Sequence, residues 1–313
     1  MKRSLFIALL ITSGNPAVAQ HPEPFDVAIT VDDLPAHGPL PKGTSRLAIA
    51  EAYLKTLRAH HVPEAFGFVN TGKLEAGPDS EAVLAAWRRA GYPLGNHGVT
   101  HLNLDRAASL AAWQADVTGG EDVIARHMRG ADWRWYRFPN LAAGSTLARH
   151  DAADAYLHDR GYRIAQVGIA FSDWSYTDAY VRCLTAGDGA AIAAMKAAYL
   201  DGVDAGIARM RKVSMRVYGR MVPQVLLTHL GAWSAATLPD VLRRLDAAGA
   251  RYVTLAKAQA DPAYAGAQVL PGGGGIMDRT AKARAIDLTD LSNVAPTPAP
   301  KSFCAQARIS DDQ

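Results

Sequence analysis

Two adjacent carboxylates and two closely spaced histidines are the residues whose types and spacing most suggest catalysis. Asp32-Asp33 directly follow an apolar run that ends at Val31, and His97 and His101 are four residues apart. That spacing brings both imidazoles to one side of a helical turn, so they can bind one cation. Adjacent side chains of an extended strand point to opposite sides, so one aspartate can bind a cation and the other handle a proton. Two histidines and one carboxylate leave coordination positions open, as a catalytic metal site requires.

Each pair also has a structural explanation when it is taken alone. Aspartate is common in turns, and Pro35 follows the two aspartates. A histidine pair at this spacing is often on the surface or satisfied in the core. Gly98 follows the first histidine and no Glu lies between the two, which excludes the zinc-protease motif.

His229 is the candidate proton donor. It follows the apolar run Val225–Leu227, and histidine has the unperturbed pKa best suited to protonating a leaving group near neutral pH. A polar strand end facing water is the alternative. Arg137 and Asp173, of opposite charge, both follow strand-like runs, so a pairing between them would hold Asp32 and set its pKa. A purely structural salt bridge explains them equally well.

Two tryptophans and the remaining histidines complete the candidate residues. Trp174 and Trp233 are suited to form an apolar wall against an acetyl methyl or a sugar face, although buried core explains either. The other histidines have no convergent partners in the sequence, and most are expected on the solvated surface: His37, His60, His61, His127, His150 and His158.

The elements that must position these residues alternate between short β-prone runs and longer stretches with helical spacing, which predicts parallel strands covered by helices. The predicted strands are 27–31, 65–69, 92–94, 135–138, 163–167, 224–227 and 252–255. Leu47, Leu54 and Leu57 share one helix face, and Val83 and Trp87 share another. In a barrel of parallel strands, the loops at the carboxyl ends of the strands open on one face, and the candidate polar residues fall in those loops.

Three further regions have distinct textures. Residues 189–218 are predicted to form a helical insertion before the sixth strand. At the start of the second predicted helix, Asp79 or Ser80 is suited to act as the N-terminal cap. After Tyr264, consecutive glycines at 272–275 and alternating prolines at 296–300 predict a flexible or extended tail. We therefore expect a catalytic domain over 25–264 and a Gly/Pro-rich extension over 265–313.

The amino terminus resembles a signal peptide over residues 1–19. Lys2 and Arg3 precede an apolar run from Leu5 to Ile11, and Ala17-Val18-Ala19 fits a cleavage site. The run is shorter than the roughly 20 residues of a membrane span, so we expect export to the periplasm or medium without stable membrane insertion. An oxidising compartment would permit a disulfide between Cys183 and Cys304, the only cysteines, but does not require it.

In order along the chain, these motifs resemble those of the polysaccharide deacetylase family, the NodB-type family 4 carbohydrate esterases. The resemblance covers about residues 25–256 and implies a distorted seven-stranded (β/α) barrel. The resemblance also implies a role for each motif. Asp32 would be the general base, His229 the general acid, and Asp33, His97 and His101 the metal ligands. The motif Arg137-Phe138-Pro139-Asn140 would orient the base and supply the Asn140 amide to the oxyanion hole, and Asp173-Trp174 would be the fourth motif.

Four positions depart from the family pattern. Leu34 stands where Gly is usual, Gly98 where Ser or Thr is usual, and Asn140 where Tyr is common. Ala170 stands where the earlier acid of the fourth motif is expected. None of these removes a proposed ligand, base or acid, but together they predict a pocket that differs from that of better-known members.

The sequence therefore predicts a hydrolase that uses a divalent cation, with zinc preferred over other transition metals, to remove acetyl groups from an amino sugar or polysaccharide. One alternative is an O-acetyl esterase acting on glycans such as xylan, because the same site would serve. An alternative from another class is an inactive carbohydrate-binding barrel. The net charge of +3 is dispersed along the chain, which gives no electrostatic footprint for nucleic acid.

Overall fold

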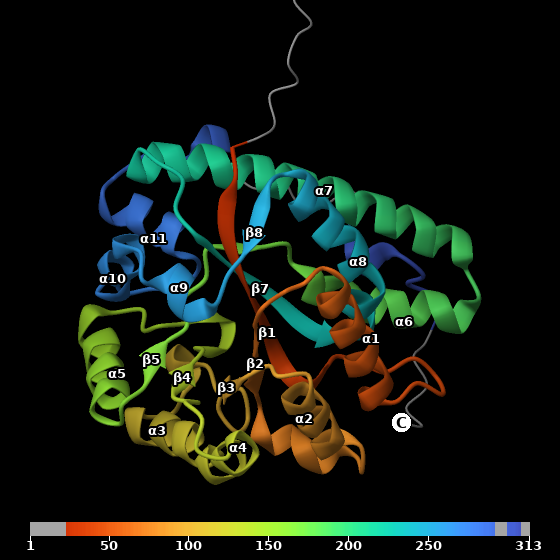
Figure 1. The fold of residues 1–313 in the computed structure, drawn as a ribbon, viewed down its shortest axis with the longest axis horizontal. Coiled ribbons are helices and arrows are strands. Elements are labelled where there is room, and N and C mark those ends of the chain that lie inside the picture. Colours follow the sequence, from red (N-terminus) through yellow and green to blue (C-terminus); the bar gives the residue numbers. More distant parts are fainter. Residues whose placement is uncertain (1–22, 292–298, 308–313) are drawn as a thin grey trace, which may run out of the picture.

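The computed structural model describes residues 23–291 and 299–307, and its strands form one parallel sheet. These strands are β1 (Phe25–His37), β2 (Ala65–Val69), β3 (Leu94–Asn96), β4 (Trp135–Tyr136), β5 (Arg163–Ile164), β6 (Ile169–Ala170), β7 (Gln224–Gly231) and β8 (Ala250–Tyr252). The order across the sheet is β5-β4-β3-β2-β1-β7-β6, and β8 pairs with the start of β1. The sheet curls into a half-barrel with helices around it (Figure 1), which confirms the predicted distorted barrel of parallel strands.

The helices cover the outside of the sheet. They are α1 (Arg46–Ala59), α2 (Ser80–Arg89), α3 (Leu110–Thr118), α4 (Glu121–Met128), α5 (Leu147–Asp159), α6 (Thr177–Ala186), α7 (Gly189–Tyr218), α8 (Ala232–Ala247), α9 (Leu255–Gln259), α10 (Pro262–Gln268) and α11 (Ile276–Ala283). Single 3₁₀ turns lie between them: η1 (Thr71–Ala76), η2 (Leu104–Arg106), η3 (Pro139–Leu141), η4 (Asp173–Tyr176), η5 (Thr289–Leu291) and η6 (Pro300–Ser302). None of the helices in the described ranges is long and apolar enough to cross a membrane.

The predicted helix faces are buried, but one predicted cap is not formed. Leu54 and Leu57 of α1 and Trp87 of α2 are almost fully enclosed in the core. Asp79 precedes α2 without capping it, because its carboxylate accepts a hydrogen bond from the backbone N–H of Leu47 instead. The start of α2 is thereby joined to the start of α1.

Each of the seven predicted strands overlaps a strand of the sheet, and the fifth needs a correction. The run 163–167 forms only the short β5, and a further strand, β6, follows at Ile169–Ala170 and pairs with β7. The seven-strand count therefore missed one strand. β5 and β6 are the two edge strands of the sheet. Residues 165–168 connect them without regular strand pairing.

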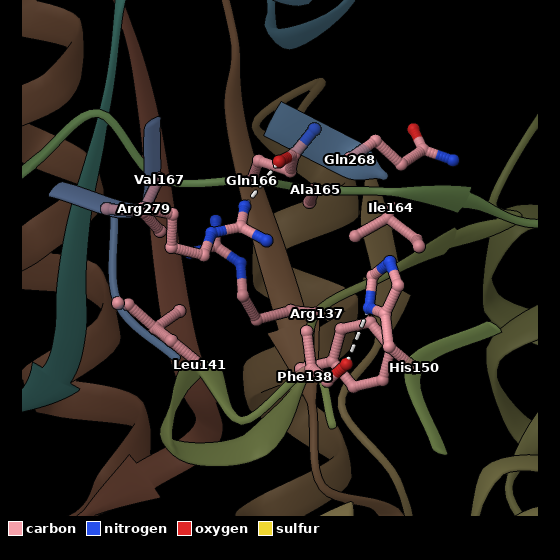
Figure 2. Close-up of a pocket in the computed structure, with 12 residues that line it drawn as sticks. Arg137, Phe138, Leu141, His150, Ile164, Ala165, Gln166, Val167, Gln268 and Arg279 are labelled. Carbon is pink, nitrogen blue, oxygen red and sulfur yellow. Dashed lines mark hydrogen bonds between the residues drawn. The ribbon is translucent and has the colours of Figure 1, made fainter. Parts of the chain in front are cut away.

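This seam between β5 and β6 is covered by the region from α9 to α11. Gln166 donates its side-chain amide to the carbonyl of Tyr264 and accepts from Arg279, while its backbone N–H donates to Gln259. Ile276 donates its backbone N–H to the carbonyl of Val167. The Arg279–Gln166 contact is visible beside Arg137 in Figure 2. Residues 165–168 are thus held through the helices behind them.

These contacts correct the prediction of a flexible tail that starts after Tyr264. Ile276, Met277 and Ala281 of α11 are buried in the main hydrophobic core. The helix packs against α10 and α7, so at least the part up to residue 291 is integral to the fold. The prolines at 296 and 298 and the predicted signal peptide at 1–19 lie outside the described residues. The helical insertion predicted at 189–218 is confirmed as α7.

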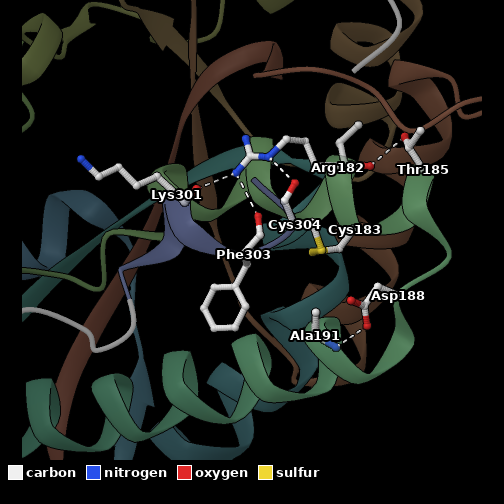
Figure 3. Close-up of a disulfide and its surroundings, with 9 residues drawn as sticks. Arg182, Cys183, Thr185, Asp188, Ala191, Lys301, Phe303 and Cys304 are labelled. Carbon is white, nitrogen blue, oxygen red and sulfur yellow. Dashed lines mark hydrogen bonds between the residues drawn. A yellow bond between two sulfur atoms is a disulfide. The ribbon is translucent and has the colours of Figure 1, made fainter. Parts of the chain in front are cut away.

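A disulfide fastens the carboxyl-terminal segment to α6. Cys183 and Cys304 are bonded, with their Cα atoms 5.3 Å apart. Arg182, next to Cys183, donates hydrogen bonds to the carbonyls of Lys301, Phe303 and Cys304 (Figure 3). The bridge that the sequence permitted is therefore formed, and it holds η6 against α6 and η4.

Candidate metal centre and active site

The two adjacent aspartates lie at a break in the pairing of β1. The register of β1 with β2 shifts between Val31 and Leu34, and Asp33 has a left-handed backbone with φ of 67°. The expectation of regular extended backbone at this pair is therefore wrong. Asp32 and Asp33 are nonetheless both buried, at 2% and 5% exposure, and both carboxylates reach the centre of the site.

The three predicted metal ligands come together. One donor atom each from Asp33, His97 and His101 lies within 4.8 Å of the other two. His97 contacts the backbone carbonyl of Arg137 through Nδ1 at 2.8 Å. Because a carbonyl only accepts, Nδ1 carries the proton, and the lone pair of Nε2 remains available for a cation.

The protonation states of these three side chains fit a divalent cation. Burial lowers the pKa of His97 and of His101 to about 4, so both are neutral at pH 7. Burial would raise the pKa of Asp33, but the hydrogen bond from His37 and the charge of Lys73 hold that pKa well below its usual value. One carboxylate and two neutral imidazoles are the donors that zinc and related metals bind.

Asp32 remains free for proton transfer beside this cluster. Its Oδ2 lies 3.6 Å from Nε2 of His97, and its buried Oδ1 has no hydrogen-bond partner within the described ranges. Burial raises the pKa of Asp32 to about 6, and the positive charges of Arg137 and His229 oppose that rise. A carboxylate with a pKa near 6 is well matched to a general base at neutral pH.

His229 lies beside Asp32 on the neighbouring strand β7, and its side chain is held by Asp173. Asp32 and His229 are register partners in the pairing of β1 with β7. Nδ1 of His229 lies 2.9 Å from Oδ1 of Asp173, and Oδ2 accepts from the His229 backbone N–H and from Ser234. Burial lowers the pKa of His229, but the charge and hydrogen bond of Asp173 outweigh it and raise the pKa overall.

Arg137 is close to Asp32 but is not bonded to Asp173, so the predicted Arg137–Asp173 pair is not formed. Nη2 of Arg137 donates to the hydroxyl of Thr30 at 2.8 Å, and the fully buried guanidinium lies over the ring of Phe68. Asp173 instead orients His229. Arg137 therefore acts on Asp32 through its electrostatic field and on His97 through its backbone carbonyl.

The third-motif loop follows Arg137. Pro139 and Asn140 form the turn η3, where Asn140 has a left-handed backbone with φ of 55°. The Asn140 side chain accepts a hydrogen bond from Asn103. Left-handed backbone at residues other than glycine thus recurs around the site, at Asp33, His101, Asn140 and Ser172. Such conformations are strained and are concentrated at functional sites.

The sequence and the fold both match known families. Residues 19–161 match the family model for polysaccharide deacetylase. This part of the chain is therefore similar to that family. No curated protein matches the chain significantly.

Several solved structures are similar to this chain in fold. The chitin deacetylase from the fungal pathogen Colletotrichum lindemuthianum has a TM-score of 0.50 at 18% identity, over 76% of this chain and 89% of that chain. A family 4 carbohydrate esterase from Streptomyces lividans has a TM-score of 0.47 at 18% identity, over 75% and 95%. A family 4 pseudoenzyme from Bacillus anthracis has a TM-score of 0.48 at 14% identity, over 76% and 66%. At 18% identity, the likeness to the chitin deacetylase establishes the fold alone.

Two side chains of the candidate site were missed by the sequence analysis. Nδ1 of His37 lies 2.7 Å from Oδ2 of Asp33, and its Nε2 lies 3.3 Å from the carbonyl of Trp174. The ammonium of Lys73 lies 3.1 Å from Oδ1 of Asp33. Expecting His37 on the solvated surface was therefore wrong. Its spacing of four residues from Asp33 was the available signal, but the break in β1 hides which way the chain turns.

His150 also departs from its predicted surface position. It is 2% exposed, and its Nδ1 lies 2.7 Å from the carbonyl of Ala143. The two tryptophans separate in role. Trp174 is 55% exposed, whereas Trp233 is buried and stacks on Tyr176. The suggestion that Trp233 contacts a sugar or an acetyl group is therefore wrong.

Gly98 has a physical reason to depart from the family's Ser or Thr. Its φ is 77°, and a Cβ atom there would lie 2.3 Å from Oδ2 of Asp116. Asp116 cannot easily move away, because its Oδ1 accepts from both the backbone N–H and the hydroxyl of Thr100. A side chain at position 98 would therefore disturb the loop that carries His97 and His101, the two candidate metal ligands.

We expect Gly98→Ser to lower the free energy of unfolding by about 3 kcal/mol, through left-handed strain and overpacking together. Urea unfolding followed by circular dichroism measures this change. Gly130→Ser is the matched control, because Gly130 has a φ of 83° and open space around the added Cβ. It should cost only about 1 kcal/mol. Equal losses in the two variants would contradict the assigned role of Asp116.

Proposed function

We propose that this chain is a metal-dependent hydrolase that removes acetyl groups from an N-acetylated amino sugar or polysaccharide, with zinc as the preferred metal. The observation that carries the proposal is the convergence of Asp33, His97 and His101, with the free carboxylate of Asp32 beside them and the His229–Asp173 pair across the sheet. This set contains the cation donors, the base and the acid that amide hydrolysis requires.

The proposed reaction divides the work among these side chains. Asp33, His97 and His101 would hold a divalent cation, which would supply polarisation of the acetyl carbonyl and a lowered pKa of water. Asp32 accepts the proton of the attacking water, so that the new carbon–oxygen bond forms. The backbone N–H of Asn140 donates to the developing oxyanion. His229 then gives its proton to the nitrogen as the carbon–nitrogen bond breaks, which releases acetate and a free amine.

His229 must be protonated to act in this way, and Asp173 helps to keep it so. Asp173→Asn removes a negative charge that raises the pKa of His229. We therefore expect the basic limb of the kcat/KM profile to move to lower pH, because the acid loses its proton earlier. Ser234→Ala is a control that removes a neutral partner of Asp173 and should shift the limb less. An unchanged basic limb in Asp173→Asn would contradict the role of His229 as acid.

Substrate and bond type are tested by release of acetate. The purified protein is incubated with N-acetylglucosamine oligomers and with acetylated xylan, before and after treatment with a chelator and after addition of zinc. The proposal expects release from the N-acetylated oligomers that is lost with the chelator and restored by zinc. Release only from xylan would identify an O-acetyl esterase instead. Release from neither glycan, with or without metal, would leave an inactive barrel and end the proposal.

We also propose that the protein works outside the cytoplasm, in the periplasm or the medium. The signal-like sequence at residues 1–19 motivates this proposal. The disulfide between Cys183 and Cys304 supports it, because such bonds persist in oxidising compartments. Fractionation of the native cells, with immunoblotting of each fraction, tests it. Detection only in the cytoplasm, as the unprocessed chain, would refute it.

A further inference from the structure

A pocket at the seam of the barrel lies apart from the three proposed metal ligands. It contains about 370 Å³ including its open mouth. Arg137 and Arg279 both line it, together with His150 and Gln166 (Figure 2). Its remaining walls are largely apolar, with Phe138 and Ile164 among them. No acidic side chain contributes to this lining.

The two guanidinium groups in this pocket are deeply buried and only partly bonded. Arg137 is 0% exposed and Arg279 is 9% exposed. Nη2 of Arg137 donates to Thr30, whereas its Nε and Nη1 have no partner among the described residues. Arg279 donates to the carbonyl of Leu270 and to Gln166, and within the same described part its Nε has no partner. Three buried N–H-bearing nitrogen atoms are thus left without an acceptor.

The charge of the pair is not neutralised from within the pocket. The partners of both arginines are a hydroxyl, a carbonyl and an amide, all of them neutral groups. Asp32 attracts Arg137 electrostatically, but it forms no hydrogen bond with it. Asp278, the neighbour of Arg279 in α11, pairs with Arg209 instead. Buried charges in proteins are normally paired. Two buried guanidinium groups in one pocket therefore indicate a binding site for an anion.

We infer that this seam pocket binds a small carboxylate anion, whose oxygens accept from the free N–H groups of Arg137 and Arg279. Guanidinium N–H groups form strong, charge-assisted hydrogen bonds with carboxylates. The apolar walls suit a short alkyl end, such as the methyl of acetate, better than a fully hydrated anion such as sulfate. The inference does not rest on the proposed function, because the free donors exist whatever reaction the site performs.

Binding is tested with sodium acetate as the probe. Acetate is titrated into the full metal-loaded protein by calorimetry at constant ionic strength, with sodium chloride and sodium sulfate as the other arms. We expect saturable acetate binding that Arg279→Met weakens by about tenfold or more and that Arg279→Lys partly retains. No saturable binding to the wild type, or equal binding to Arg279→Met, would overturn the inference. Equal binding of chloride or sulfate would overturn the assignment to carboxylates.

Two further measurements separate this pocket from the metal centre and guard against a variant that fails to fold. Acetate binding should persist in Asp33→Ala, because the pocket does not include that carboxylate. Its disappearance there would assign the binding to the metal centre and overturn the inference. In the wild type, proton–nitrogen NMR of the arginine Nε–H groups should show two buried signals that shift with acetate. Failure of any arginine Nε–H signal to shift at saturating acetate would also overturn it.

Discussion

Asp33→Ala should abolish metal binding and, with it, acetate release. Asp33 supplies the anionic donor to a cluster whose other two donors are neutral imidazoles, so its loss removes the formal charge that attracts the cation. We expect the affinity for zinc to fall by about 100-fold or more, which exceeds the usual effect of removing an outer-shell partner. Metal content after dialysis, measured by mass spectrometry, reports the loss directly.

The control for this variant is Asp122→Ala, which removes an exposed carboxylate in the first turn of α4. It should retain the metal content and activity of the wild type. Lys73→Ala offers a test of opposite sign. The Lys73 ammonium contacts Oδ1 of Asp33 and competes with a cation for that carboxylate, so its removal should raise the affinity for zinc. Stoichiometric zinc in purified Asp33→Ala would contradict the whole assignment of the metal centre.

His229→Ala should have the second large effect, on turnover and not on metal. Its ring is bonded to Asp173 and is not part of the three-residue donor cluster, so the metal content should be unchanged. Loss of a general acid typically costs about 10²- to 10⁴-fold in rate. The cost should be greatest for an N-acetyl substrate, because an amine leaves poorly without a proton. An O-acetyl substrate should lose less, since an alkoxide departs more easily.

The role of His229 as acid is tested by comparing turnover of O-acetyl and N-acetyl substrates. The ratio of O-acetyl to N-acetyl turnover should rise in His229→Ala relative to the wild type. His158→Ala is the matched control, because its imidazole is 86% exposed at the end of α5. Full activity of His229→Ala on N-acetylglucosamine oligomers, measured with metal content intact, would show that another group protonates the leaving nitrogen.

The meeting of the polar residues at one face could be predicted because it follows from topology. Parallel strands place their carboxyl ends together, so polar residues after successive apolar runs must converge. Asp33, His97 and His101 meet for this reason, although they are up to 68 residues apart in the sequence. The helix α7 was equally predictable, because a long run of good helix formers requires no tertiary information.

The contacts made by single side chains could not be predicted in the same way. His37 reaches Asp33 only because β1 breaks its register at the aspartates, and a left-handed residue there has no signature in the sequence. Arg137 was matched with Asp173 by opposite charge and by their positions at strand ends, whereas His229 is the partner of Asp173 in space. The burial of α11 was hidden by the preceding glycines, which resemble a linker until the helix is seen to pack in the core.

The bond between Cys183 and Cys304 closes a covalent ring with a sequence separation of 121 residues. This ring contains His229 but none of the three proposed metal ligands. On the loop-entropy estimate, a ring of that size raises the free energy of the denatured chain by about 5 kcal/mol. The proposed acid His229 thus lies inside the ring and the proposed metal ligands lie outside it, and reduction of the bond should lower the free energy of unfolding by up to that amount.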